Sequence, residues 1–310
     1  MYLNAFAHSL SRLDMTKTEE FTSLLKSAGD LNIPYELPTP YFSNQTVVNG
    51  MRFHYLEWGN PENPPLVVVH GGNQTAHSWD LVSLTLARKF HVFAPDQRGH
   101  GDSEHPRDAE MNPSQMAEDM RELIRAWGID RPIILAHSMG GIMTMYLLTR
   151  NPNLAQRVAF VDIGPDTTVS NEGGQAIRQF VTENREFDSM EKFIENVHEY
   201  DPFRSEEHIR RTAKYNLLQR ADGKFVSKHV LRNQSLRTMN RPTLEDVKRI
   251  GCPALVIRGG ESNMLTPEGA VAFAEALPQG KTVTVPNCGH NVHSQNTQGF
   301  LEVTLPFIGF

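Results

Sequence analysis

The segment 133–141 constrains the fold of this chain most, because it joins an apolar run to a helix-like pattern through a single serine. Residues 133–136 read Ile-Ile-Leu-Ala, and two glycines follow Ser138 and Met139. A serine on so tight a strand-to-helix turn presents its hydroxyl above the sheet, beside the first N–H groups of the helix. We therefore predict that Ser138 is a nucleophile and that the Met139 N–H faces a developing oxyanion.

Short apolar runs recur along the chain, separated by helical stretches such as 116–127. They lie at 66–69, 92–94, 133–135, 158–161 and 254–257, with a further strand candidate at 282–285. Strands that alternate with helices in this way predict an α/β fold with a mostly parallel sheet, covered by helices on both faces. Ahead of them, the pair Asn49-Gly50 between β-rich runs predicts a hairpin turn.

The pattern divides the chain into three parts. Residues 1–44 form an N-terminal extension with a predicted helix, expected to pack on the main body; dimerisation or covering the site are the alternatives. Residues 45–163 and 246–310 form the α/β core. Residues 164–245 carry no strand signal and predict an all-helical cap over the strand ends, where ligands bind. Its predicted helices are 176–183, 190–200 and 206–218.

Composition excludes several classes of protein. The formal net charge of -6 argues against a nucleic-acid partner or an anionic membrane surface, which select a basic face. We find no apolar stretch of the roughly 20 residues that span a bilayer, and no signal-peptide pattern. The two cysteines, Cys252 and Cys288, do not make a disulfide framework. We expect reduced thiols in a cytoplasmic enzyme.

A serine hydroxyl is a weak nucleophile until a base removes its proton. Our candidate base is His290, which ends the segment 286–290 directly after the last strand candidate, at the sheet edge where the strand-to-helix turns gather; His293 is a weaker candidate. The oxyanion needs preorganised N–H donors. Glycines after the strand 66–69 allow the backbone to approach a ligand closely, so we pair the Gly72 N–H with that of Met139.

Four motifs resemble, in order, the cap-bearing esterase, lactonase and C–C hydrolase branch of the α/β-hydrolase superfamily. They are His70-Gly71-Gly72, the segment 96–103, the serine turn, and Cys288-Gly289-His290. The resemblance covers about residues 45–310 and implies an α/β-hydrolase fold, a Ser–His–acid triad, a helical cap, no cofactor and no metal. Ala136 replaces the first glycine of Gly-x-Ser-x-Gly, a mild departure. We expect 96–103 to be a rigid, charge-paired structural loop.

The third member of the triad departs further from the family pattern. The usual acid follows the strand 254–257, but Asn263 holds that position. Asparagine can orient an imidazole but does not match a carboxylate in stabilising the imidazolium. Asp162 ends the strand 158–161, where some superfamily members place their acid, and is our candidate; Glu261 and Asn263 stay as alternatives. If Asp162 has a structural instead of a catalytic role, we expect it to cap the start of a helix.

These residues predict a serine hydrolase that cleaves an uncharged carboxylic ester or lactone through an acyl-enzyme on Ser138. A serine at position 138, where an aspartate would be needed, argues against dehalogenase and epoxide hydrolase chemistry. The alternatives are a C–C bond hydrolase of ring-fission products and a ligand-binding or signalling module on a hydrolase frame, which Asn263 favours. The expected partner is a small-molecule substrate, with a homodimer as an open alternative; the sequence does not name the ester.

Overall fold

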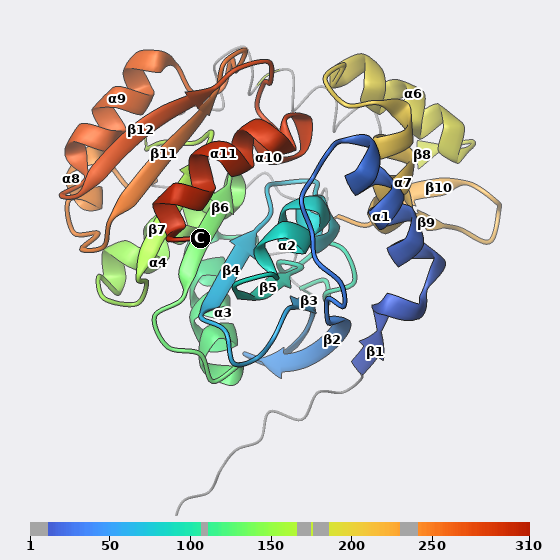
Figure 1. The fold of residues 1–310 in the computed structure, drawn as a ribbon, viewed down its shortest axis with the longest axis horizontal. Helices are drawn as coiled ribbons and strands as arrows, with labels where there is room; N and C mark the ends of the chain where they lie inside the picture. Colours follow the sequence, from blue (N-terminus) through green and yellow to red (C-terminus); the bar gives the residue numbers. More distant parts are fainter. Residues whose placement is uncertain (1–11, 107–110, 166–174, 176–185, 230–240) are drawn as a thin grey trace, which may run out of the picture.

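The centre of the molecule is a nine-stranded sheet in the order β1-β2-β3-β5-β4-β6-β7-β11-β12 (Figure 1). The computed structural model describes residues 12–106, 111–165, 175, 186–229 and 241–310. The strands are β1 Arg12–Asp14, β2 Tyr41–Val48, β3 Met51–Trp58, β4 Pro65–Val69, β5 His91–Pro95, β6 Ile133–His137, β7 Arg157–Val161, β11 Ala254–Gly259 and β12 Gly280–Val285.

The sheet is mostly parallel, as predicted. The six strands from β5 to β12 in this order run parallel to one another, and β3, β2 and β1 continue the sheet beyond β5 as an antiparallel edge. Asn49 and Gly50 close the predicted hairpin between β2 and β3, with Val48 opposite Met51. Both turn residues have positive φ, the backbone that a two-residue hairpin turn requires.

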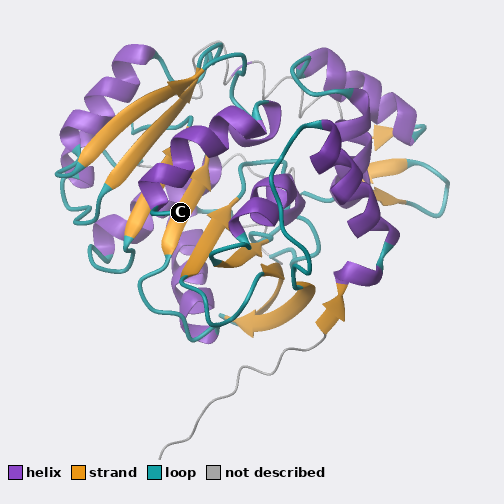
Figure 2. Ribbon diagram, viewed as in Figure 1, coloured by secondary structure: helices purple, strands orange, loops and turns teal. Residues whose placement is uncertain are grey.

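Helices cover both faces of the sheet, which is why its central strands are apolar throughout (Figure 2). Leu66 and Val68 of β4 join one core, while Val67 and Val69 join the other. The first core includes α1 Glu19–Asp30, α2 Asp80–Leu86 and α11 Thr297–Ile308. The second includes α3 Pro113–Ala126, α4 Met139–Arg150, α8 Leu244–Val247 and α9 Pro267–Ala276. The two cores fix β6, and so the serine turn, between them.

The N-terminal extension is part of the body over its described residues. Thr18 caps α1 by accepting from the Phe21 N–H, and Phe21 and Leu24 of this helix enter the first core. The outer face of α1 ion-pairs with the cap helix α7 Glu206–Asn216 at Glu20–Lys214, 3.0 Å, and at Lys26–Glu207. The extension therefore contacts both the core and the cap (Figure 1).

The prediction of an all-helical cap is wrong. α6 Met190–Tyr200 and α7 match two predicted helices, and the third, 176–183, lies almost wholly outside the described residues. The cap also contains a three-stranded antiparallel sheet, in which β8 Glu186–Phe187 precedes α6 and both β9 Leu217–Gln219 and β10 Phe225–Ser227 follow α7. Strands of two or three residues are too short for an alternating pattern to register in the sequence. The turn between β9 and β10 contains Gly223 at a φ of 86°.

Within the described ranges, the chain has no helix that is both long and apolar enough to cross a membrane. Cys252 and Cys288 are both free and buried, as expected for reduced thiols. Burial raises the pKa of the Cys288 thiol to about 11, and its Sγ donates to the Val285 carbonyl at 3.3 Å. A thiol in that state is a weak nucleophile at neutral pH.

Candidate active site

The serine turn has the strained backbone that the sequence pattern predicts. Ser138 has a φ of 49° and a ψ of -117°, a region that residues other than glycine rarely occupy, and it caps α4 directly after β6. Its N–H donates to the Val161 carbonyl at 3.1 Å, which fixes the turn to β7. At Gly140 an added Cβ would lie 2.6 Å from the His70 carbonyl oxygen, so only glycine allows this close strand-to-helix packing.

Ser138, His290 and Asp162, which we call the elbow triad, form a hydrogen-bonded chain. Ser138 Oγ lies 2.9 Å from His290 Nε2, and His290 Nδ1 lies 2.8 Å from Asp162 Oδ2. Because an ionised carboxylate only accepts, Nδ1 carries the proton and Nε2 is free to accept from the serine hydroxyl. This is the tautomer that a general base needs.

The structure distinguishes among the three candidates for the acid by position. Asp162 is fully buried at the end of β7 and accepts from the Gly259 N–H at 2.9 Å and the Ser262 hydroxyl at 2.5 Å. Glu261 and Asn263 are exposed, and within the described residues neither side chain bonds to His290. Since β7 is the neighbour of β11, a carboxylate at the end of either strand reaches the same place.

The two expected oxyanion donors lie on neighbouring segments beside Ser138. Met139 is the first residue of α4, so its N–H has no acceptor within the helix. Gly72 follows β4, and a Cβ added there would lie 4.0 Å from the Met139 Cβ. The loop is shaped by Gln74, whose Oε1 accepts from the Gly71 N–H at 2.9 Å.

Two further histidines lie beside the elbow triad, and burial lowers the pKa of each. Burial, with His290 and His293 nearby, lowers the pKa of His137 well below its usual range, and its Nε2 bonds to the His290 carbonyl oxygen at 2.9 Å. Burial, together with Arg204, lowers the pKa of His293 to about 3, and its ring stacks on Trp79 at 4.0 Å. His290 alone of these three bonds to Ser138 among the described contacts.

The sequence did not predict that the His137 side chain bonds to the backbone of His290. The position of His137 next to Ser138 draws attention to the side chain, but the ring bonds to the His290 carbonyl oxygen and so holds the loop of His290. The sequence holds no signal for this contact, because the two residues are 153 positions apart.

The loop 96–103 is a charge-paired structural loop, as expected from its sequence. Arg98 and Asp119 form a buried ion pair at 2.5 Å, which ties the loop to α3. Asp96 accepts from the Ala76 N–H at 2.7 Å and from the Asp102 N–H at 2.9 Å. These contacts hold the chain around the ends of β4 and β5 and place no carboxylate at His290.

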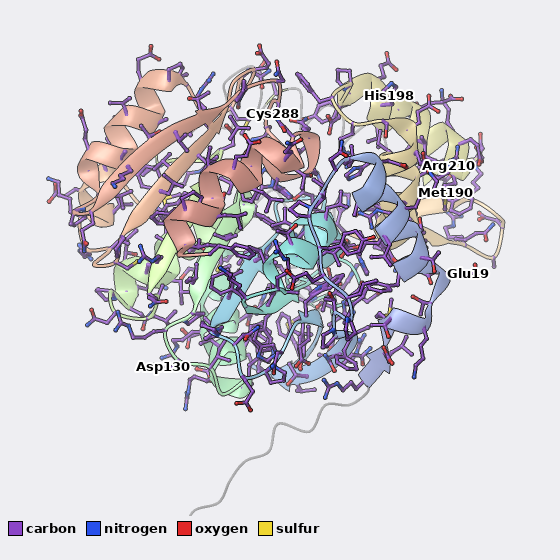
Figure 3. The ribbon with its side chains drawn as sticks, in the orientation of Figure 1. Glu19, Asp130, Met190, His198, Arg210 and Cys288 are labelled. Carbon is purple, nitrogen blue, oxygen red and sulfur yellow. The ribbon has the colours of Figure 1, made fainter. Side chains whose placement is uncertain are left out.

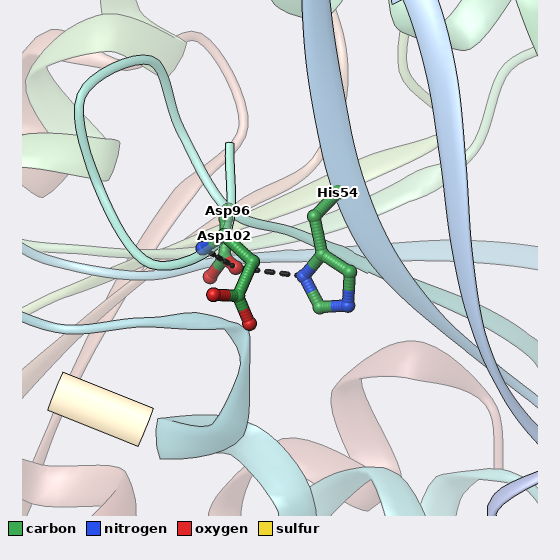
Figure 4. Close-up of side chains that lie close together, drawn as sticks. All are labelled: His54, Asp96 and Asp102. Carbon is green, nitrogen blue, oxygen red and sulfur yellow. Dashed lines mark hydrogen bonds and ion pairs between the residues drawn. The ribbon is translucent and has the colours of Figure 1, made fainter. Parts of the chain in front are cut away.

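Asp96 also belongs to a second hydrogen-bonded array, with Ser43 and His54, which we call the strand triad. His54 Nδ1 lies 2.7 Å from Asp96 Oδ2 (Figure 4). His54 Nε2 lies 2.9 Å from Ser43 Oγ. His54, Asp96 and Asp102 have the residue types of a metal site, and their ligand atoms lie within 4.8 Å of one another. Both Asp96 oxygens already accept N–H groups, so the cluster is satisfied by the protein itself.

Comparison with known proteins agrees with the architecture. A family model described as the alpha/beta hydrolase fold matches residues 64–297. The esterase Rv0045c of Mycobacterium tuberculosis is 24% identical over 95% of this chain and 97% of its own length. A solved structure of that esterase has a TM-score of 0.78 at 23% identity, covering 95% of this chain and all of that one (100%).

Two other relatives carry different names. A soluble epoxide hydrolase of Corynebacterium is 36% identical over 42% of this chain and 44% of its own length. The sn-1-specific diacylglycerol lipase ABHD11 of Mus musculus is 27% identical over 81% of this chain and 82% of its own.

Proposed function

Because the chain belongs to the α/β-hydrolase family, we propose that it hydrolyses an uncharged carboxylic ester or lactone through an acyl-enzyme on Ser138. The observation that carries the proposal is the elbow triad on a strained strand-to-helix turn, with Ser138 Oγ 2.9 Å from His290 Nε2. Relatives named esterase and diacylglycerol lipase support an ester as the bond cleaved.

In the first half of the reaction, His290 takes the proton of Ser138 as Oγ attacks the ester carbonyl carbon. The N–H groups of Gly72 and Met139 donate to the oxyanion of the tetrahedral intermediate. The C–O bond to the alcohol then breaks, and His290 returns the proton to the leaving oxygen. Asp162 keeps the imidazole in the required tautomer and stabilises its charged form.

In the second half, His290 removes a proton from water as the water oxygen attacks the acyl carbon. The bond from that carbon to Ser138 Oγ breaks, the serine regains its proton, and the carboxylic acid leaves. With a lactone, the alcohol and the acid are the two ends of one product.

An uncharged substrate fits the electrostatics around the elbow triad. Burial lowers the pKa values of His137 and His293, which favours the uncharged form of each ring. Arg204 is paired with Asp201 at 2.8 Å, so it offers little free charge to a carboxylate or phosphate on a substrate. The described surroundings of the triad thus favour a neutral acyl group.

A panel of p-nitrophenyl esters and lactones of graded acyl length, run on the parent protein and Ser138→Ala side by side, tests the proposal. We expect turnover of at least one ester by the parent and a loss of about 10³-fold or more in the variant. Vinylogous 1,5-diketones belong in the same panel, since a serine relay also serves C–C hydrolysis. Turnover by Ser138→Ala near the parent rate would remove the serine mechanism.

A further inference from the structure

A buried carboxylate of the cap faces the loop that carries His290. Asp201 directly follows α6, and its side chain is 1% exposed. Its Oδ1 accepts from Gln295 Nε2 at 2.6 Å; its Oδ2 accepts from Arg204 Nε at 2.8 Å and from Asn291 Nδ2 at 3.3 Å. All three of these donors are side chains, and two of them belong to the core.

The two core donors hold the backbone on both sides of His290. Asn291 is the next residue along the chain. Gln295 ends the short helix α10 Val292–Gln295, and its Oε1 accepts from the Gly289 N–H at 2.7 Å, just before His290. Asp201 is therefore linked to the backbone on both sides of His290, through the side chain of Gln295 before it and that of Asn291 after it. Figure 3 labels Cys288 on this loop and His198 on α6, the elements that these bonds join.

The same network continues to the expected oxyanion loop. Asn291 Oδ1 accepts from Gln74 Nε2 at 3.0 Å, and Gln74 Oε1 accepts from the Gly71 N–H at 2.9 Å. One cap carboxylate is thus connected by hydrogen bonds to the base loop and, through it, to the loop of Gly72.

A carboxylate suits this position because it only accepts and here meets three donors. Burying a charge is costly unless it is paired and fully hydrogen-bonded. Arg204 supplies the pairing charge, and its own carbonyl accepts from His198 Nδ1 at 2.9 Å, which fixes the turn 201–204. An asparagine at position 201 would replace one of the two accepting oxygens by an NH₂ group. That group would face an N–H donor, so a hydrogen bond would be lost.

We propose that Asp201, although it belongs to the cap, is a positioning residue for the reaction: it fixes the backbone around His290 and so the distance from Nε2 to Ser138 Oγ. The inference rests on the proposed function. Because a displacement of about 1 Å at a reacting group can lower a rate about 100-fold, loosening this loop acts on kcat more than on KM.

The test is a double-mutant cycle of Asp201→Asn and Gln295→Glu, with kcat and KM measured on the best ester of the panel. Each single variant places two like groups opposite each other at the contact between residues 201 and 295. In Asp201→Asn the two groups are N–H donors, and in Gln295→Glu they are carboxylates. Each should lower kcat about 10- to 100-fold with KM within about threefold. In the double variant the amide at 201 donates to the carboxylate at 295, which still accepts from Gly289, so kcat should return to within about threefold of the parent.

A matched control is Asp188→Asn, an Asp-to-Asn change in the same cap at a side chain that is 90% exposed, expected to leave kcat unchanged. Should Asp201→Asn fail to fold, Gln295→Leu removes the same bridge from the core side and carries the same expected loss. Urea unfolding separates a loss of stability from a loss of rate.

Three results would overturn the inference. They are a kcat within twofold of the parent for Asp201→Asn, a higher KM at unchanged kcat, or a double variant as slow as the singles. Failure of the proposed function gives a different result, since Ser138→Ala then keeps its turnover.

Discussion

Two serine–histidine–aspartate arrays in this molecule have almost the same internal geometry. In the elbow triad the two hydrogen bonds measure 2.9 and 2.8 Å, and in the strand triad they measure 2.9 and 2.7 Å. Both aspartates are buried. Distances within the array therefore do not separate a proposed active site from a structural contact.

The difference lies around the serine. Ser43 sits within β2, opposite Leu13 of β1 and Leu56 of β3, so its backbone is part of a regular ladder. Ser138 has a positive φ, starts a helix, and has the Gly72 backbone nearby. A hydroxyl becomes an effective nucleophile where preorganised donors meet the charge that its attack creates. We therefore expect the groups around each serine, and not the Ser–His–Asp hydrogen bonds alone, to decide how reactive its hydroxyl is.

The largest expected effect is on covalent labelling of the two serines. A fluorophosphonate should modify Ser138 rapidly and Ser43 not at all, because only the first has donors for the phosphonyl oxygen. Peptide mass spectrometry locates the adduct, and Ser43→Ala should label at the parent rate while Ser138→Ala should not label. An adduct at Ser43 would show that the geometry of the Ser–His–Asp hydrogen bonds is sufficient to make a serine reactive.

The two aspartates give the second contrast. Asp162→Asn should lower kcat by about 10³- to 10⁴-fold, because the amide no longer stabilises the imidazolium or holds the tautomer. Asp96→Asn should leave kcat within a few-fold and lower the free energy of unfolding by about 1–3 kcal/mol, since a buried donor loses its acceptor. Glu261→Gln is the control for the acid, expected within twofold of the parent kcat.

Steady-state kinetics and urea unfolding on the same preparations separate the two effects. A larger kcat loss for Glu261→Gln than for Asp162→Asn would move the acid to Glu261. Two mild effects would favour Asn263 serving with no direct acid.

Much of this comparison could be predicted from the sequence because its signals are local. An apolar strand, a serine and two glycines define the turn at Ser138, and alternating strands and helices define the parallel sheet. Asp162 could be proposed because it ends the strand 158–161, after which some members of the family that the chain resembles place their acid. The alternative of a non-catalytic module drew on Asn263, whereas the structure has the carboxylate of Asp162 at 2.8 Å from His290 Nδ1.

What the sequence did not predict depends on contacts between distant segments. The short strands of the cap pair through backbone groups that any residue carries, so β8 and β10 leave no pattern. His137 and Asp201 act on the His290 loop from positions 153 and about 90 residues away. The strand triad joins Ser43, His54 and Asp96, whose spacing matches no motif.

The smallest expected effect concerns the free energy of unfolding in acid. His293, beside the elbow triad, and Asp96, in the strand triad, should change this free energy at different pH values. Burial, with Arg204 nearby, lowers the pKa of His293 to about 3, against about 6.5 when unfolded. Between these values the unfolded chain holds one more proton than the folded chain. The free energy of unfolding therefore falls as the pH falls, by at most about 1.4 kcal/mol per pH unit from this group.

His293→Phe keeps a ring to stack on Trp79 and removes that proton uptake, so its stability should fall less steeply from pH 6 to pH 4. Within the strand triad, burial opposes ionisation of Asp96, but the His54 hydrogen bond holds its pKa well below the usual value. Asp96→Asn should therefore change the slope only below about pH 4. Urea unfolding at half-unit steps of pH measures both slopes. A His293→Phe line parallel to the parent would mean that the folded protein already protonates this ring, and the neutral surroundings assigned to the elbow triad would be wrong.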